Sequence, residues 1–330
     1  MKKEINAMKD KLNVYRRAAL KAVEYQIGFQ LPDGGYIWDG YPVDGFHKQA
    51  LSWQLSGRFV EALRLLNWVK KNKLQSDGQL KDYKGDLYKH SWFFQGAHLL
   101  GRFDLSCPVW SFLLAQQAPC GGLPHFAGDE LIRSMSTAWT GVSALYFGNM
   151  DVATKIAKCS ISMLEQQPRE DRFYFQMTRA GKLVTEKENP EAQFIDTTKP
   201  RQCYWEVGFA MLLMCKMYQA TGDKSYLDFA KRFFEFKLRC YKDNFAYWGS
   251  GKSALAAANY YMLTGDERAQ NAAYAFCDFV VETQTAEGGF RYEADEPDDL
   301  IIYVDHAACF SVWAGESVKI FESLEAGKVS

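Results

Sequence analysis

A short cassette recurs along the chain, and its spacing constrains the fold more than any other feature of the sequence. It reads glutamine, three residues, glycine, one more residue, then an aromatic or apolar side chain. The clear copies span residues 30–36, 117–123 and 284–290, and degenerate copies begin at Leu74, Gln167 and Cys240. Four of the five intervals between copies lie between 43 and 50 residues. Such a period predicts stacked helical hairpins, because one hairpin alone cannot bury its apolar face.

Between the cassettes, apolar residues recur with the spacing of an α-helix. The stretch before each cassette has a polar stripe and predicts a solvated outer helix: roughly 5–28, 60–72, 107–117, 150–167, 224–241 and 267–284. The stretch after each cassette is rich in small and apolar residues and predicts a buried inner helix: about 45–57, 89–101, 134–148, 203–221, 249–264 and 304–322. Six helices of each kind predict an all-α fold, an (α/α)6 toroid with a central cavity.

We expect residues 1–330 to form a single toroid domain with one insertion. Residues 172–178 alternate in polarity, turn at 179–181 and return, which predicts a β-hairpin within an insertion at about 172–202. This insertion is equally consistent with a flap over the mouth and with a decorative element. The loops that carry the cassettes are long, so we expect the functional site at the amino termini of the inner helices.

The charge balance and the cysteine pattern limit the partners and the compartment. Lys plus Arg (39) nearly equals Asp plus Glu (40), so no basic surface indicates nucleic acid. No segment is apolar and long enough to predict a membrane span, and the amino terminus does not resemble a signal peptide. Eight cysteines without a Cys-x-x-Cys pair indicate reduced thiols. We therefore expect a cytoplasmic protein with a small-molecule substrate; the sequence does not predict its oligomeric state.

The cassette and its sixfold recurrence resemble the QW repeats of the terpenoid-cyclase and protein-prenyltransferase superfamily. The resemblance covers nearly the whole chain and implies the toroid more than a reaction, because unsaturated-glucuronyl hydrolases and sugar epimerases share the architecture. The chain also departs from the superfamily. Residues 296–299 (Glu-Pro-Asp-Asp) are its nearest match to an Asp-x-Asp-Asp acid motif, and no Asp-x-Cys zinc pair occurs. Protein prenyl transfer is therefore set aside.

Polar residues gather at one rim when the inner helices are aligned on their starts. Three of the five histidines fall at corresponding positions, and ring closure would bring the sixth repeat beside the first. A carboxyl group next to an imidazole can hold or relay a proton. The candidate catalytic residues are Asp44, His47, His90, Glu206, Asp305 and His306.

Aromatic and polar side chains near this rim are candidates for binding a substrate. Aromatic rings stack on sugars and shield cations. The candidates are Trp38, Asp39, Tyr88, Trp92, Trp139, Tyr204, Trp205, Trp248, Lys252 and Tyr303. Three histidines and an aspartate also suit zinc or iron. No short-range ligand motif supports a metal, so we expect neither a metal nor a cofactor.

Structural roles compete with these assignments. Asp44 and Asp305 are well placed to cap helices, and a buried Glu206 needs a partner such as Lys252 or Arg201.

The preferred hypothesis is an acid–base enzyme, a terpenoid or polyene cyclase or isomerase with Asp44 or Asp305 as donor. The alternatives are a glycan-active hydrolase or epimerase and a non-catalytic binding toroid. A dry, wholly aromatic pocket favours the terpenoid, whereas a polar cleft open at both ends favours a saccharide.

Overall fold

The computed structural model describes residues 2–36, 45–290 and 300–329. Within these ranges the polar stripes form outer helices as predicted: α1 (Lys2–Ile27), α3 (Phe59–Asn72), α5 (Phe103–Ala115), α7 (Met150–Glu165), α9 (Lys224–Arg239) and α11 (Glu267–Thr283). The apolar stretches form inner helices: α2 (Gln49–Leu55), α4 (Leu87–Leu99), α6 (Ser134–Phe147), α8 (Trp205–Thr221), α10 (Gly251–Thr264) and α12 (Leu300–Val329). No helix of the described ranges is long and apolar enough to cross a bilayer.

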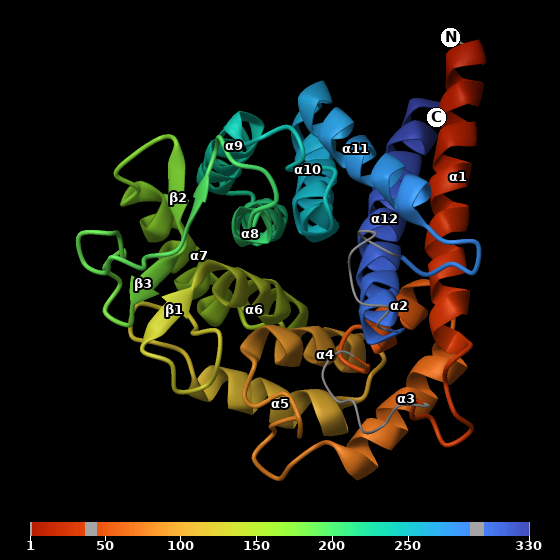
Figure 1. Cartoon of the computed structure of the whole chain (residues 1–330), viewed down its shortest axis with the longest axis horizontal. Helices are drawn as coiled ribbons and strands as arrows, with labels where there is room; N and C mark the ends of the chain where they lie inside the picture. Colours follow the sequence, from red (N-terminus) through yellow and green to blue (C-terminus); the bar gives the residue numbers. More distant parts are fainter. Residues whose placement is uncertain (1, 37–44, 291–299, 330) are drawn as a thin grey trace.

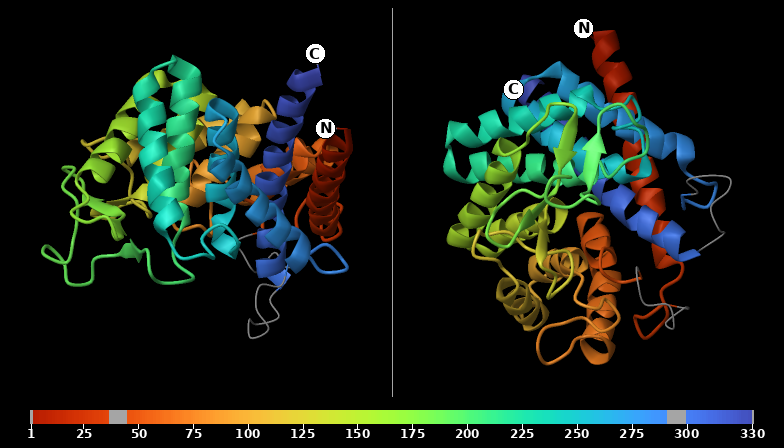
Figure 2. Two further views of the ribbon diagram at one scale, coloured as in Figure 1. Left: turned by 90° about the horizontal axis from the view of Figure 1, so that it is seen from above. Right: turned by 60° about the vertical axis from the view of Figure 1, so that its left-hand side comes forward.

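The helices form a closed (α/α)6 toroid, as the repeat predicted. Each inner helix packs against the next around the ring, and α12 closes it by contacting both α1 and α2 (Figure 1). The amino and carboxyl termini consequently lie near each other, as both views of Figure 2 also show.

The cassettes are tight turns. Each follows an outer helix in the chain, and its glycine, where it has one, packs against the next outer helix of the ring. In the third copy, Gln117 donates its side-chain N–H to the carbonyl of Gly121 at 3.0 Å, across the turn. Gly121 has φ of 92°, and a Cβ atom there would lie 2.5 Å from the carbonyl oxygen of Lys155 on α7. The turn therefore requires glycine for two reasons, a left-handed backbone and a carbonyl in contact.

The last cassette makes the same glycine-to-carbonyl contact, with the first helix of the chain, where the ring closes. Gln284 donates to the carbonyl of Ala18 on α1 at 2.9 Å. A Cβ atom on Gly288 would approach the carbonyl oxygen of Lys21 to 2.6 Å. The carboxyl-terminal repeat is thereby docked on the first helix of the chain.

The insertion contains a hairpin, but its strands pair differently from the prediction. Backbone bonds from Thr178 N to Lys182 O and from Val184 N to Gln176 O form the expected turn. The outgoing segment is divided, however. Strand β2 (Arg172–Tyr174) pairs with β4 (Phe194–Asp196), and β3 (Gln176–Thr178) pairs with β1 (Leu131–Arg133), immediately before α6. The insertion is therefore fixed to the third inner helix.

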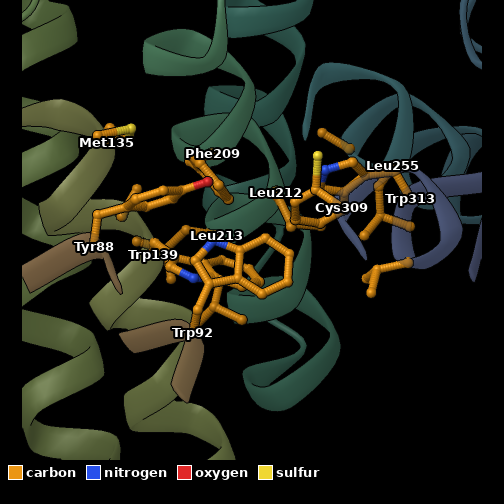
Figure 3. Packing of buried hydrophobic residues seen from close by; sticks show 14 of the residues in the cluster. Tyr88, Trp92, Met135, Trp139, Phe209, Leu212, Leu213, Leu255, Cys309 and Trp313 are labelled. Carbon is orange, nitrogen blue, oxygen red and sulfur yellow. The ribbon is translucent and has the colours of Figure 1, made fainter. Parts of the chain in front are cut away.

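Aromatic side chains fill the centre of the ring. Trp92, Trp139 and Trp313 come from three different inner helices and are almost fully buried. Their ring centroids lie 4.9 to 5.7 Å apart, and Phe209 packs against Trp139 at 4.8 Å (Figure 3). Trp92 and Trp139 were predicted to bind a substrate, but their rings belong to the core. Side chains therefore fill the axis of the ring at the level of these tryptophans.

Substitution of Gly288 tests whether the cassette contact holds the ring together. Gly288→Ala forces a methyl group against the Lys21 carbonyl and should lower the free energy of unfolding by about 3 kcal/mol. Gly265→Ala is the matched control, because Gly265 also has a positive φ (72°) but nothing within 4 Å of its Cβ position. The control should lose only about 1 kcal/mol. Equal losses in urea unfolding would show that the contact contributes nothing.

Candidate functional site

A cavity of about 290 Å³ opens near the amino-terminal ends of the inner helices. It is lined by charged, imidazole and aromatic side chains: His47, Lys48, Asp86, Tyr88, Lys89, His125, Arg133, Met135, Trp205, Trp248, Lys252, Asp305, His306 and Cys309. Within the described residues, the insertion contributes no side chain to this lining, so we find no flap there. The site is polar rather than a dry aromatic pocket.

An ion pair between Asp305 and Lys48 joins the last inner helix to the first. Lys48 donates to both carboxylate oxygens of Asp305, at 2.5 and 2.6 Å, and its side chain is only 6% exposed. Asp305 is 16% exposed, so its carboxylate remains accessible from the cavity. The two short contacts with the ammonium group fix the orientation of the Asp305 carboxylate.

His47 lies behind this pair and is neutral. Its Nε2 atom is 3.9 Å from Asp305 Oδ1, and its Nδ1 atom is 3.3 Å from the hydroxyl of Tyr83. Complete burial, reinforced by the charge of Lys48, holds the pKa of His47 well below its usual value. The His47 imidazole therefore lies near the Asp305 carboxylate and is itself uncharged.

A second ion pair fixes Arg133 at the opposite part of the lining. Arg133 Nε donates to Glu206 Oε1 at 2.6 Å, and Glu206 Oε2 accepts from the backbone of Met135 at 2.8 Å. The guanidinium also lies over the ring of Phe175, 5.2 Å from its centroid. The insertion, which carries Phe175, thus supports a residue of the cavity from behind.

Glu206 occupies a different place from the one predicted. We expected a carboxylate facing the cavity, or one paired with Lys252 or Arg201. Its partner is instead Arg133, and Glu206 is fully buried and does not line the cavity described here. Burial raises the pKa of Glu206, while the charge of Arg133 opposes that effect. The geometry favours a positioning role, in which Glu206 orients Arg133.

Lys252 presents an ammonium group to the cavity without a protein partner. The residue is 5% exposed, and among the described residues its Nζ atom makes no hydrogen bond or ion pair. Its nearest aromatic contact is the ring of Trp205, 5.9 Å away. Burial lowers the pKa of Lys252 to about 8. A buried cation without a counter-ion is a natural contact for an anionic ligand.

The two tryptophans of the lining form a continuous aromatic wall. Trp205 and Trp248 have centroids 5.3 Å apart, and the Trp248 ring lies 5.6 Å from that of His306. His306 in turn stacks on Phe310 at 5.5 Å with an interplanar angle of 2°. The indole planes of Trp205 and Trp248 are tilted by 41° to each other, and each offers an aromatic face suited to a sugar ring.

Several predicted residues lie away from the cavity. His90 accepts from the backbone of Leu80 at 2.9 Å and donates to the carbonyl of Asp86 at 2.5 Å, so it connects a cassette to α4. Burial lowers the pKa of His90 to about 4. The hydroxyl of Tyr204 donates to Asp243 at 2.8 Å, outside the lining, and Tyr303 is also outside it. Trp38, Asp39 and Asp44 lie outside the described residues.

The sequence reasoning missed several residues of the lining. His125 borders the cavity, and burial together with the charge of Arg133 lowers its pKa to about 4. The other additions are Lys48, Lys89, Arg133, Met135 and Cys309. Lys48 and Arg133 carried a usable signal, since each is a cation beside the start of an apolar inner helix. Asp86 also lines the cavity.

The described residues contain no group of three or more His, Cys, Asp or Glu side chains arranged to hold a metal ion. The described lining instead combines four basic side chains with two carboxylates. The basic side chains are Lys48, Lys89, Arg133 and Lys252, and the carboxylates are Asp86 and Asp305.

Comparison with known proteins connects this fold to glycan-active enzymes. The Glycosyl Hydrolase Family 88 model matches residues 180–302, which is less than half of the chain. No curated protein sequence matches the chain. An unsaturated glucuronyl hydrolase specific for heparin is similar in structure, with a TM-score of 0.64, 11% identity and coverage of 96% of this chain and 98% of its own.

Two further structures share the toroid. An inactive variant of an alpha-1,6-mannanase from Salegentibacter sp. HEL1_6, in complex with alpha-1,6-mannotetrose, has a TM-score of 0.63 and 13% identity, and the match covers 91% of this chain and 98% of the mannanase. A D-mannose isomerase has a TM-score of 0.62 and 13% identity, with 89% and 96% covered. At these identities the similarity establishes the fold. The terpenoid part of the predicted resemblance receives no support from these comparisons.

Removal of the Lys252 charge should stabilise the protein in a pH-dependent way. Below pH 8 the folded state encloses an ammonium group, so Lys252→Met should raise the free energy of unfolding by up to about 3 kcal/mol at neutral pH. The gain should shrink between about pH 8 and 10.5, because the folded wild type loses this proton while the unfolded chain keeps it.

Urea unfolding of both proteins near neutral pH and at about pH 9.5 measures this difference. Lys231→Met on the exposed face of α9 is the control and should change stability by less than about 0.5 kcal/mol at either pH. An identical gain for Lys252→Met at both values would contradict the enclosed charge.

Proposed function

We propose that this protein is a saccharide-active enzyme, a glycoside hydrolase whose substrate carries an acidic group. The observation that carries the proposal is the polar cavity, where two carboxylates, an unpaired buried cation and a tryptophan wall converge. The partial match to the Glycosyl Hydrolase Family 88 model and the toroid of the similar glucuronyl hydrolase and mannanase support it.

A saccharide suits this cavity better than a prenyl chain. Charged groups line it, and a hydrocarbon would remove them from water without replacing their hydrogen bonds. The hydroxyl groups of a sugar can form hydrogen bonds with these charged groups. Trp205 and Trp248 offer aromatic faces to the C–H faces of the sugar. The charged lining therefore favours a glycan-active enzyme over the terpenoid or polyene cyclase that the sequence analysis preferred.

The distribution of charge favours an acidic sugar. Asp305 neutralises Lys48, and Glu206 neutralises Arg133 from behind. Lys252 has no such partner among the described residues, so within them the lining carries more positive than negative charge. A carboxylate or sulfate on the substrate would supply the missing anion.

Two carboxylates can provide the acid and base that glycoside hydrolysis requires. We assign Asp305 the role of base or stabiliser of positive charge at the sugar, because its carboxylate borders the cavity and Lys48 fixes its orientation. Asp86 is the second carboxyl of the lining and is assigned proton donation to the leaving oxygen. Glu206 orients Arg133, and Arg133 and Lys252 hold the substrate.

A sugar isomerase is the second candidate, and the neutral imidazoles favour it. Burial keeps His47 and His125 uncharged at neutral pH, and permanent cations lie beside them. Neutral imidazoles can exchange a proton at carbon while cations stabilise the enediolate that forms. A D-mannose isomerase shares the toroid.

A substrate screen separates these readings. Unsaturated uronyl disaccharides, followed by loss of their ultraviolet absorbance, are expected to be turned over. Alpha-1,6-mannooligosaccharides and mannose test the neutral-sugar and isomerase readings, and prenyl alcohols test the cyclase. Binding of sugars without turnover of any of them would favour a non-catalytic toroid.

Asp305→Asn tests the assigned base. The amide keeps the shape and an acceptor for Lys48 but removes the negative charge, so kcat should fall by at least about 100-fold. Asp171→Asn is the control, because Asp171 pairs with Arg169 on the exposed surface away from the cavity. Unchanged turnover in folded Asp305→Asn protein would remove this residue from the mechanism.

Lys252→Met tests the assigned anion contact. For an acidic substrate, kcat/KM should fall by about 10- to 100-fold, corresponding to the loss of one charge-assisted hydrogen bond. The loss for the uncharged analogue, in which the carboxylate is an amide, should be much smaller. Equal losses for the two substrates would indicate that Lys252 does not recognise the acidic group.

A further inference from the structure

The amino group of Lys252 is enclosed at the cavity wall without a counter-ion. Lys252 lines the cavity, is only 5% exposed, and makes no hydrogen bond or ion pair with any described residue. Its Nζ atom lies over the ring of Trp205, 5.9 Å from the centroid, and Trp205 belongs to the same lining. The end of the side chain, and not only its aliphatic stem, is therefore placed at the cavity.

The position of Lys252 in the fold favours the uncharged amine. Burial removes the ammonium group from water, which penalises the charged form. Lys252 is also the second residue of α10 (Gly251–Thr264), and the positive end of a helix dipole disfavours a cation in the first turn. Burial, with a smaller contribution from the charge of Lys48, lowers the pKa of Lys252 to about 8. Roughly a tenth of the molecules therefore carry the free amine at neutral pH.

Three other lysines of the described ranges are buried, and each of them has an acceptor for its Nζ atom. The acceptors are the carboxylate of Asp305 for Lys48, the carboxylate of Asp82 for Lys73 and the carbonyl of Asn244 for Lys237. Lys73 and Lys237 also lie outside the lining of the cavity. Among the buried lysines that the structure describes, only Lys252 thus combines a place at the cavity with an amino group that has no acceptor.

A carbonyl compound is the class of ligand that suits such an amine. Desolvated lysines in hydrophobic or cationic surroundings are the ones that form Schiff bases with carbonyl substrates. The cavity, with about 290 Å³, is small for a ligand pocket and suits a single sugar unit or a smaller molecule. The free reducing end of a sugar is a hemiacetal in equilibrium with an open-chain aldehyde. A sugar held in this cavity therefore carries the group with which the amine can react.

We propose that Lys252 is a carbonyl-reactive amine, which condenses reversibly with the aldehyde of a small sugar or sugar acid held in the cavity. The neutral Nζ atom attacks the carbonyl carbon, the C=O π bond breaks, and a proton passes through solvent from nitrogen to oxygen to give a carbinolamine. The carbinolamine hydroxyl then takes a proton from solvent and leaves as water, which forms a protonated imine. Hydrolysis of the imine reverses both steps, and no group is oxidised or reduced.

This reaction goes beyond the proposed hydrolysis, in which Lys252 acts only as a cation. The ammonium form binds an anion, whereas the amine form supplies the lone pair that attacks a carbonyl carbon. Because condensation needs only the amine and an aldehyde, it does not depend on whether the protein hydrolyses glycosides.

The test exposes the whole wild-type protein at neutral pH to a small aldehyde and sodium cyanoborohydride, which reduces the imine to a stable secondary amine. Glycolaldehyde is the uncharged probe, and glyoxylate is the probe that carries a carboxylate. Proteolytic peptides are then quantified by mass spectrometry. Lys252 should be modified at least about tenfold faster than Lys231, which is exposed on α9, because a much smaller fraction of an exposed lysine is neutral at this pH.

Two further measurements separate this proposal from the proposed function. Lys252→Arg should lose the fast phase of labelling in the intact mass. An excess of glucuronate should slow the labelling of Lys252 but not of Lys231 if acidic sugars occupy the cavity. Fast labelling of Lys252 without this protection supports the reactive amine and counts against an acidic substrate.

The proposal is overturned if neither aldehyde labels Lys252 faster than Lys231, whether or not the protein hydrolyses glycosides. The comparison of the two lysines within the wild type decides this even if the variant fails to fold.

Discussion

The contact between the glycine-bearing cassettes and the neighbouring outer helix is the constraint on which the toroid depends. The turn places a glycine against a helical carbonyl oxygen, with Gly121 meeting Lys155 and Gly288 meeting Lys21. A side chain at either position would push the turn away from the next hairpin. Because the last copy docks on α1, the same local interaction that stacks successive repeats also joins the two ends of the chain.

The buried charged residues near the cavity fall into two groups, paired and unpaired. The pairs Lys48–Asp305 and Arg133–Glu206 each connect two inner helices and satisfy both partners. Lys252 is enclosed without such a partner in the described structure, at a cost to stability. Paired charges shape the cavity, whereas the unpaired charge is available to a ligand. The distribution of paired and unpaired charge therefore indicates which side chain would contact a ligand.

The helices could be predicted from the sequence because their apolar periods are long and the cassettes mark their ends. The direction of individual side chains could not. His90 follows the cavity-lining Tyr88 by two residues, and about 200° of rotation turns it to the other face of α4. Trp92 and Trp139 each lie five residues after their helix starts, which places them roughly 7 Å below the rim and in the core. The partner of Glu206 also required the fold, because Arg133 is far from it in sequence.

The tryptophan core has a consequence for the route of any guest. In the described part of the chain, Trp92, Trp139 and Trp313 fill the axis of the annulus, so a guest in the cavity cannot pass along that axis beyond the tryptophan layer.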